Sequence, residues 1–439
     1  MKVLKFGGTS VGTAQRIKDV AQLVHKRGKN IVVLSAMSGT TNTLVEISDY
    51  LYKNNIDGAR ETINALDRRY AGVIAELFGH SGEYAESAAE AIAESINFLR
   101  NFNKPVFTRF DEKEILARGE MMSTALMYRY MLSQGMDVVM LPALDFMRTD
   151  KNAEPDTAYI RRHLLEMIDR EPDARIYLTQ GFICRNAYGE IDNLERGGSD
   201  YTASLIGAAV SAEEIEIWTD IDGMHNNDPR FVEHTSPVSQ LHFEEAAELA
   251  YFGAKILHPT CVLPAKLANI PVRLLNTMDP DAHGTVIFNA PSTHTIKAVA
   301  AKDNITAIKI KSGRMLLAYG FLRKVFEIFE THRTAIDMIV TSEVGVSVTI
   351  DNERNLHAIL EDLRKFGTVT VDRDMVIICV VGDLEWQNRG FEADVVNALK
   401  EIPVRMISYG GSNYNISLLV RKSDKVRALN LLSERLFNK

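Results

Sequence analysis

The first chemically distinctive residues of this 439-residue chain lie in a glycine turn near the N-terminus. Lys5 is part of a short apolar run that predicts a strand, and Gly7, Gly8 and Ser10 follow directly. Such a turn exposes backbone N–H groups, and the positive end of a following helix favours phosphate oxygens at the same place. Lys5 is spaced to direct a cation there. The pattern predicts a phosphate-binding loop, although a tight turn without a ligand would use the same glycines.

Two common nucleotide-binding motifs do not fit this turn. Gly7 and Gly12 have the spacing of a Walker A loop, but Thr13 stands where that motif requires lysine. The sequence also contains no G-x-G-x-x-G string, so a dinucleotide-dependent dehydrogenase has no support.

Four further strings place polar residues where chemistry could occur. Residues 33–42 (VLSAMSGTTN) again join an expected strand to a small-residue turn, which N-capping by Ser or Thr would also explain. Residues 119–123 (GEMMS) put a carboxylate in a helical stretch, where a solvated surface glutamate is the ordinary alternative. Residues 194–203 (LERGGSDYTA) combine a guanidinium suited to a carboxylate, two glycines for close backbone approach and a helix-capping Ser-Asp pair. Residues 218–220 (WTD) end an expected strand.

In chain order, these strings resemble the amino-acid kinase family, and the aspartate kinases within it, over nearly the whole chain. Residues 5–10 and 33–42 carry the strongest likeness, and residues 119–123 resemble a helix start that holds a substrate's α-amino group. The resemblance implies a carbamate-kinase-like α/β/α sandwich with a mainly parallel sheet. The implied reaction converts ATP and L-aspartate to ADP and 4-phospho-L-aspartate, the first step toward lysine, threonine and methionine.

The resemblance also implies roles for individual residues. The catalytic residues would be Lys5, Asp200 and Lys255. Aspartate would be held by Thr41, Glu120, Arg196 and Ser199. The nucleotide would be held by Lys5, Gly7, Gly8, Ser10, Thr219, Asp220, His225, Arg230 and Lys255. The chain departs from the family pattern at Asp222, where proline is frequent, and at His225, where a tyrosine near the base is frequent.

The chemistry of this reaction needs charge neutralisation more than proton transfer. The β-carboxylate of aspartate is already ionised at neutral pH, so its attack on the γ-phosphate needs no general base. Positioning and electrostatics then carry most of the catalysis. We expect Mg²⁺ to arrive with ATP and to be held mostly by its phosphates, and no dedicated metal site is expected.

The elements that must position these residues alternate between short β-branched runs and helical stretches, which predicts an α/β fold. Expected strands cover residues 3–6, 31–35, 137–141, 176–180, 214–219 and 272–275. Expected helices include residues 16–27 and 157–168, and segment 58–135 has room for several more. We expect the catalytic domain to span residues 1–290.

The C-terminal part has a different order of expected strands and helices, which is that of two successive β-α-β-β-α-β units. We expect the first unit at residues 304–373 and the second at 374–439, where the chain stops one strand short. The spare strand 296–302 is expected to complete the second unit, so that the two interleave. Because the chain ends with the second unit, no fused homoserine dehydrogenase is expected.

Both C-terminal units resemble ACT domains, the small-molecule sensors of aspartate kinases. The likeness to the monofunctional, lysine-inhibited type implies L-lysine as effector and a homodimer formed through these domains. The implied effector residues are Met315, Gly320, Phe321, Leu322, Asp337, Thr341, Ser342 and Glu343. Leu317 and Ala318 replace residues that are usually polar, which leaves open a shifted or absent response to lysine, and the same residues could merely hold a dimer interface.

Composition narrows the remaining possibilities. A net charge of −8 argues against nucleic acid or anionic lipid as a partner, and three separated cysteines argue against a disulfide framework. Without a signal peptide or a long apolar run, a cytoplasmic protein is expected. Two alternatives remain open: a related kinase acting on glutamate, acetylglutamate or carbamate, and a catalytically inactive amino-acid sensor.

Overall fold

The computed structural model describes residues 1–102, 104, 106–194, 197–253, 259–289, 296–312 and 319–437, and these residues form two compact units. The first unit comprises Met1–Gly223 and Leu257–Asn289, and the second comprises Met224–Ile256 and Ala290–Lys439. Residues 224–253 therefore pack with the C-terminal part of the chain, although the predicted catalytic domain, residues 1–290, includes them. We describe each unit separately.

The first unit is built on a mainly parallel sheet, which confirms the predicted α/β class. Its strands run in the spatial order β3 (Val138–Met140), β4 (Ile176–Gln180), β2 (Asn30–Leu34), β1 (Lys2–Phe6), β7 (Ile215–Thr219), β9 (Val272–Asn276) and β10 (Thr285–Ile287). Only the pairing of β9 with β10 is antiparallel among these strands. The central strands β2 and β4 are buried along their whole length, as expected for parallel strands covered on both faces.

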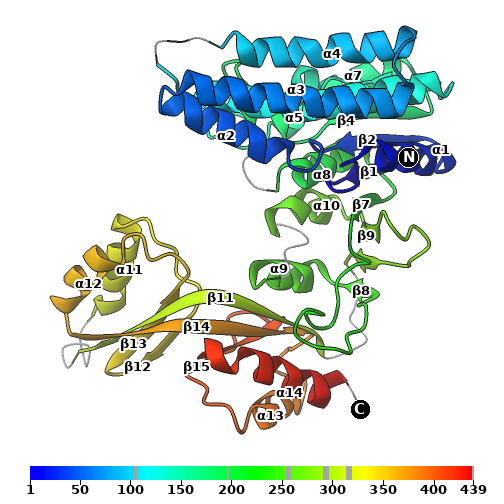
Figure 1. Ribbon diagram of the computed structural model, residues 1–439. Helices are drawn as coiled ribbons and strands as arrows, with labels where there is room; N and C mark the ends of the chain where they lie inside the picture. Colours follow the sequence, from blue (N-terminus) through cyan, green and yellow to red (C-terminus); the bar gives the residue numbers. More distant parts are fainter. Residues whose placement is uncertain are drawn as a thin grey trace. The chain divides into compact units, whose positions relative to one another are not determined.

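Helices cover the sheet, and those labelled α2, α3, α4 and α5 in Figure 1 pack against one another. The helices of this unit are α1 (Ala14–Lys26), α2 (Thr40–Tyr52), α3 (Ile56–Phe78), α4 (Glu83–Arg100), α5 (Arg109–Ser133), α6 (Ala143–Phe146), α7 (Thr157–Arg170), α8 (Gly198–Val210), the 3₁₀ turn η1 (Pro259–Val262) and α10 (Leu263–Leu267). A hairpin of β5 (Ile183–Arg185) and β6 (Ile191–Asn193) lies outside the main sheet. One apolar core joins α1 to α5 with strands β1 and β2, so the ends of these strands have a rigid support.

The second unit contains a six-stranded antiparallel sheet. Its spatial order is β12 (Ile339–Ser342), β13 (Gly345–Ile350), β11 (Ile296–Lys311), β14 (Thr368–Gly382), β16 (Asn415–Arg421) and β15 (Met406–Ser408). Its other elements are β8 (Gln240–Leu241), α9 (Phe243–Tyr251), α11 (Phe321–Thr331), α12 (Leu356–Arg364), α13 (Phe391–Ala398), the 3₁₀ turn η2 (Lys422–Asp424) and α14 (Lys425–Phe437). Two separate apolar cores lie on this sheet, one under α11 and α12 and one under α13 and α14.

Two long strands, β11 and β14, run through both halves of this sheet and appear as extended ribbons in Figure 1. The first part of β11 pairs with residues 377–382, and its second part pairs with residues 368–372. Residues 296–301 therefore lie in the sheet of the second predicted unit. The expected separate strands at 296–301 and 305–310 are, however, one continuous strand, with shifts of register between Ile296 and Ala298 and between Lys302 and Ala307.

No helix in the described ranges is both long and apolar enough to cross a bilayer.

Candidate functional site

The two glycine and hydroxyl turns predicted from the sequence contact each other at the carboxyl ends of β1 and β2. The N–H of Ser38 donates to the carbonyl of Gly8 at 3.0 Å. A Cβ added to Gly8 would lie only 2.8 Å from the carbonyl oxygen of Ala36, so a larger residue there would push the turns apart. The N–H of Gly7 donates to the carbonyl of Trp218 at 3.1 Å and fixes the first turn to β7.

Lys5 and Asp200 form an ion pair beside these turns. Nζ of Lys5 lies 2.6 Å from Oδ1 of Asp200, and the two side chains are 11% and 15% exposed. Lys5 lies next to the end of β1, while Asp200 lies in the first turn of α8. The ammonium also lies 3.7 Å from the position that a Cβ of Gly7 would take, so it stands at the glycine turn as predicted.

The start of α8 approaches the end of β4 so closely that only glycine fits between them. A Cβ on Gly181 would come within 2.4 Å of both Cβ and Oγ of Ser199. Phe182 next to it adopts a left-handed φ of 67°, which is uncommon for a bulky residue, and its N–H donates to Oγ1 of Thr202 at 2.9 Å. Ser199 in turn accepts a hydrogen bond from Ser35 at 3.0 Å, which joins α8 to the turn after β2.

Glu120 is buried in the interior of α5, which corrects the predicted helix start at residues 119–123. The helix begins much earlier, because Thr108 and Asp111 form a capping box before it. The carboxylate Oε1 of Glu120 accepts the N–H of Ala36 at 3.1 Å. Burial raises the pKa of Glu120 to about 7, against the opposing effects of the Ala36 hydrogen bond and the charge of Lys5.

These features surround one cavity of about 480 Å³ in the first unit. Five of the predicted site residues line it, namely Lys5, Gly8, Thr41, Glu120 and Ser199. The remaining lining residues are Thr9, Ser35, Ala36, Met37, Ser38, Gly39, Asn42, Phe182, Gly197 and Gly198. Several of them lie in the strings 33–42 and 194–203, whereas nothing in the sequence signals the backbone conformation of Phe182.

Other predicted residues of the first unit lie outside this lining. Ser10 is fully buried, and its hydroxyl shares a hydrogen bond of 2.7 Å with Oγ1 of Thr277. Thr219 ends β7 and accepts the N–H of Ile221 at 3.2 Å, and Asp220 is exposed beside it. Arg196 and Lys255 lie outside the described residues.

Two predicted nucleotide contacts belong to the second unit. Nδ1 of His225 lies 2.8 Å from Oγ1 of Thr235. Arg230 forms a two-pronged ion pair with Asp228, with Nη2 at 2.6 Å from Oδ2, and this side chain is largely exposed. The guanidinium is thus already engaged by a neighbouring carboxylate.

The predicted effector residues of the second unit fall in two environments. Gly320 caps α11 in a left-handed conformation (φ 82°), and Phe321 after it is buried while Leu322 is 39% exposed. Thr341 and Ser342 are exposed residues of β12, and Glu343 is exposed in the turn that follows. Met315 lies outside the described residues.

The carboxylate of Asp337, in contrast to that of Glu343, is buried. It accepts hydrogen bonds from Nζ of Lys302 at 2.7 Å and from the hydroxyl of Tyr251 at 2.8 Å. Burial raises the pKa of Asp337, although Lys302 opposes this effect. Within the described residues, the acidic group is therefore occupied by an internal cation.

No group of three or more His, Cys, Asp or Glu side chains arranged to hold a metal ion occurs in the described part of the chain.

Comparison with known proteins identifies the class that this fold and site define. The model of the amino acid kinase family matches residues 1–276, and an ACT domain model matches residues 378–436. The lysine-sensitive aspartokinase 3 of Escherichia coli is 33% identical over 455 residues, which is 99% of each chain. The chain therefore belongs to the amino acid kinase family.

Solved structures specify the activity further. The crystal structure of E. coli aspartokinase III in complex with aspartate and ADP (R-state) matches with a TM-score of 0.79 and 32% identity over 100% of both chains. The structure of the same enzyme in complex with lysine and aspartate (T-state) matches with a TM-score of 0.77 and 32% identity, over 100% of this chain and 99% of the other. The activity of this chain is that of an aspartate kinase, a phosphotransferase whose acceptor is a carboxyl group.

Proposed function

We propose that the cavity around Lys5 is where the β-carboxylate of L-aspartate attacks the γ-phosphate of ATP, which yields ADP and 4-phospho-L-aspartate. The observation that carries this proposal is the placement of Lys5, the Gly8 turn and Glu120 around one cavity. The complex of E. coli aspartokinase III with aspartate and ADP supports the choice of ligands.

Charge neutralisation at the phosphoryl group is the main task of the protein. Lys5 supplies one cation, and the N–H groups of the glycine turn add partial positive charge beside it. Asp200 holds the ammonium of Lys5 at 2.6 Å and so orients it. We assign the second cation to Lys255, on the leaving group, as the resemblance implies. Each of these groups acts on charge that develops during transfer, so it accelerates the reaction without a proton transfer.

Substrate recognition follows from the groups that face the cavity. Glu120 would receive the α-ammonium of aspartate, and Arg196 would hold the α-carboxylate. Thr41 and Ser199, which also line the cavity, would add hydroxyl contacts. An ammonium beside Glu120 favours the ionised carboxylate, so the binding of aspartate would lower the raised pKa of this residue.

The nucleotide contacts are proposed from the family pattern. Thr219 and Asp220 would serve the nucleoside together with His225, and Arg230 and Lys255 would serve the phosphates. Mg²⁺ would come with ATP and take most of its ligands from phosphate and water. When bound, it would neutralise phosphate charge.

We further propose that the C-terminal ACT region regulates the enzyme in response to L-lysine. The complex of E. coli aspartokinase III with lysine and aspartate supports this effector, as does the cap of α11 at Gly320. Asp337 already pairs with Lys302 through Oδ1, so the ammonium of an effector would share this carboxylate with Lys302 or replace it there. The same proposal divides the chain into a catalytic domain at 1–290 and two ACT units at 304–373 and 374–439, the latter completed by 296–302. It also includes a homodimer formed through the ACT region and a cytoplasmic location. The enzyme would catalyse the first step of the aspartate-family pathway.

The proposal is tested by measuring aspartate-dependent ADP release with Mg-ATP and hydroxylamine, which traps an acyl phosphate as a hydroxamate. Hydroxamate should form from aspartate and should be lost in Lys5→Ala. Turnover with glutamate or an acylated analogue in place of aspartate would contradict the substrate. Equal hydroxamate formation by Lys5→Ala and the wild type would contradict the site.

A further inference from the structure

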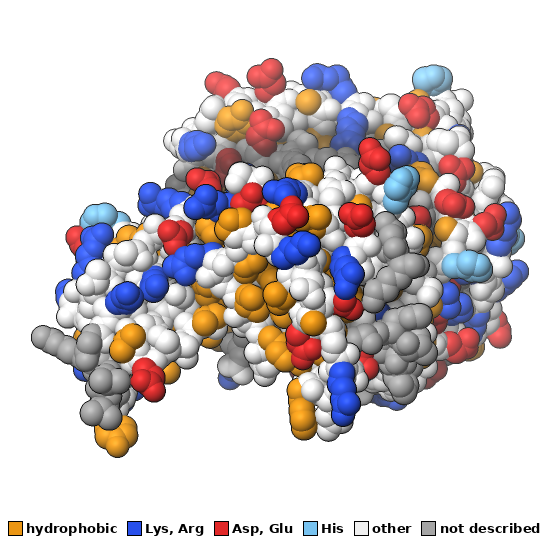
Figure 2. All heavy atoms as spheres, turned by 90° about the horizontal axis from the view of Figure 1, so that it is seen from below, with side chains coloured by type: hydrophobic (Ala, Val, Ile, Leu, Met, Phe, Trp, Pro, Cys, Tyr) orange, Lys and Arg blue, Asp and Glu red, His pale blue; other side chains and the backbone are white. Residues whose placement is uncertain are grey.

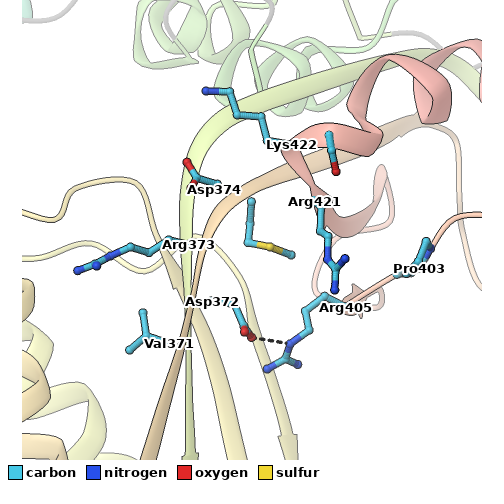
Figure 3. A pocket seen from close by; sticks show the side chains of 11 residues that line it. Val371, Asp372, Arg373, Asp374, Pro403, Arg405, Arg421 and Lys422 are labelled. Carbon is cyan, nitrogen blue, oxygen red and sulfur yellow. Dashed lines mark hydrogen bonds and ion pairs between the residues drawn. The ribbon is translucent and has the colours of Figure 1, made fainter.

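A second cavity, of about 580 Å³, lies in the second unit and is lined mainly by charged side chains (Figure 3). Four of them are cationic and two are carboxylates: Arg373, Arg405, Arg421, Lys422, Asp372 and Asp374. An excess of cations at one concave place is unexpected in a chain with a net charge of −8. The charge of this cavity therefore needs an explanation.

Only part of this positive charge is neutralised by the protein. Nε of Arg405 lies 2.9 Å from Oδ2 of Asp372, and Nε of Arg373 lies 3.2 Å from Oε1 of Glu353. Within the described residues, Arg421 and Lys422 have no carboxylate within ion-pair distance and are exposed. In Figure 3, Arg421 extends from the end of β16 toward the part of the chain that carries Arg405, whose own guanidinium is turned toward Asp372, and both residues line the cavity. Gathering like charges in this way is unfavourable unless an anion joins them.

The cavity lies where the two long strands bend. The pairing of β11 with β14 shifts register between Lys302 and Ala307, opposite residues 372–377. Asn304 and Asp374 both have a left-handed φ there, 60° and 53°. Such backbone is uncommon outside glycine and collects at ligand sites and switch regions. The lining residues 421–423 also lead directly into α14, whose N-terminal end adds positive partial charge.

We propose that this cavity binds a small organic anion through a phosphoryl group. A phosphoryl dianion can accept a two-pronged hydrogen bond from one guanidinium and further bonds from Arg421 and Lys422. A single carboxylate offers two acceptor oxygens, whereas a phosphoryl group offers three for the donors of Arg421, Lys422 and a further guanidinium. The volume exceeds that of a phosphoryl group, so an organic body fits as well. The site is separate from the catalytic cavity in its residues and does not depend on the function proposed above.

The test is isothermal titration of the full chain with inorganic phosphate, with the kinase site first saturated with ADP and aspartate. Parallel titrations use a double variant that combines Arg421→Gln and Lys422→Gln. The control variant Arg389→Gln removes a positive charge from an exposed residue outside the cavity. Removing two charge-assisted donors should weaken phosphate binding at least about tenfold, whereas the control should bind as the wild type does. Thermal melts of all variants check that they fold equally well.

Three outcomes would overturn the proposal. The first is equal phosphate affinity in the double variant and the wild type. The second is tighter binding of malonate than of phosphate, which would assign the site to dicarboxylates instead. The third is a change of molecular mass by light scattering in Arg421→Gln, without any loss of phosphate binding, which would assign the cations to a protein interface.

Discussion

The ammonium of Lys5 lies 2.6 Å from Oδ1 of Asp200, so the end of β1 and the first turn of α8 meet at one ion pair. Both side chains are nearly buried, and the glycine turn that follows Lys5 borders the pair. The carboxylate fixes where the ammonium stands before any substrate binds. Preorganisation of this kind lets a cation stabilise a transition state without moving.

Substitution of either partner should therefore reduce the rate through the same group. Lys5→Ala should lower kcat by a factor on the order of 10²–10³. Asp200→Asn should lower kcat as well, and the double variant should be no slower than Lys5→Ala, because Asp200 acts through Lys5. Steady-state kinetics of the three variants measures this, with Lys26→Ala, an exposed lysine of α1, as the matched control. Fully additive losses would show that Asp200 has a separate role.

Aspartate affinity should depend on the ionisation of Glu120. Because burial raises the pKa of Glu120 to about 7, the carboxylate is partly protonated near neutral pH and would bind the α-ammonium less well. KM for aspartate should thus fall as the pH rises through about 7, while Glu120→Gln should have a higher KM that no longer changes in this range. Initial rates between pH 6 and about 8.5 measure both. The same pH profile in wild type and variant would exclude Glu120 as the titrating group.

A rise in pH should lower the folding stability through Glu120, although the same rise should improve aspartate binding. The folded pKa of Glu120, about 7, lies above the ordinary value of 4.5, so the folded state binds the proton more tightly than the unfolded state does. The resulting stabilisation is fully present below about pH 4.5 and is lost as the pH rises through about 7. Urea denaturation of the ligand-free protein across this range should show a decline in the free energy of unfolding that is smaller in Glu120→Gln.

Close contact between β4 and α8 makes Gly181 intolerant of a methyl group. A Cβ there would lie 2.4 Å from Oγ of Ser199, so Gly181→Ala must displace the start of α8. We expect a loss of about 1–3 kcal/mol in the free energy of unfolding, together with reduced kcat/KM. Gly72→Ala is the matched control, because it lies in α3 with no atom within 4 Å of the added Cβ. That variant should gain up to about 1 kcal/mol. Chemical denaturation and kinetics distinguish the two, and a Gly181→Ala enzyme of wild-type stability and activity would contradict this packing argument.

Regulation by lysine should depend on the acidic turn after β12. Glu343 is exposed and close in sequence to the hydroxyls of Thr341 and Ser342, and its carboxylate would pair with a cationic effector. Glu343→Gln should raise the lysine concentration for half-inhibition at least about tenfold. The control is Glu361→Gln, an exposed carboxylate of α12. Inhibition curves at fixed aspartate give the comparison, and equal curves for both variants would place the effector elsewhere.

Residues whose place beside the cavity follows from the local sequence are predictable from it. Lys5 lies near the end of an apolar strand, Gly8 follows that strand, and Ser199 belongs to the string 194–203, so the sequence alone assigns each to the site. Glu120 was also assigned to the site, but its place within α5 was not anticipated. The capping box at Thr108 and Asp111 is the sequence signal that gives the true start of that helix.

Features that arise from tertiary packing were not predictable. Ser10 has the residue type of a phosphate ligand, yet its hydroxyl is buried against Thr277, a partner far away in sequence. The polar residues Asp303 and Asn304 indicate the end of a strand. However, β11 continues through a bulge at this place, where Asn304 has a left-handed conformation. Phe182 lines the cavity of the first unit in a backbone conformation that its residue type does not favour.

The continuity of β11 and β14 bears on how the C-terminal region could be inherited. Each strand contributes backbone hydrogen bonds to both halves of the sheet, and each half borders its own apolar core. A recombination event that replaced one half alone would have to cut both strands in the middle and rejoin them in register. Gene fusion or exchange should therefore transfer the pair as a whole, and we expect the two halves to have changed over evolutionary time as a single module.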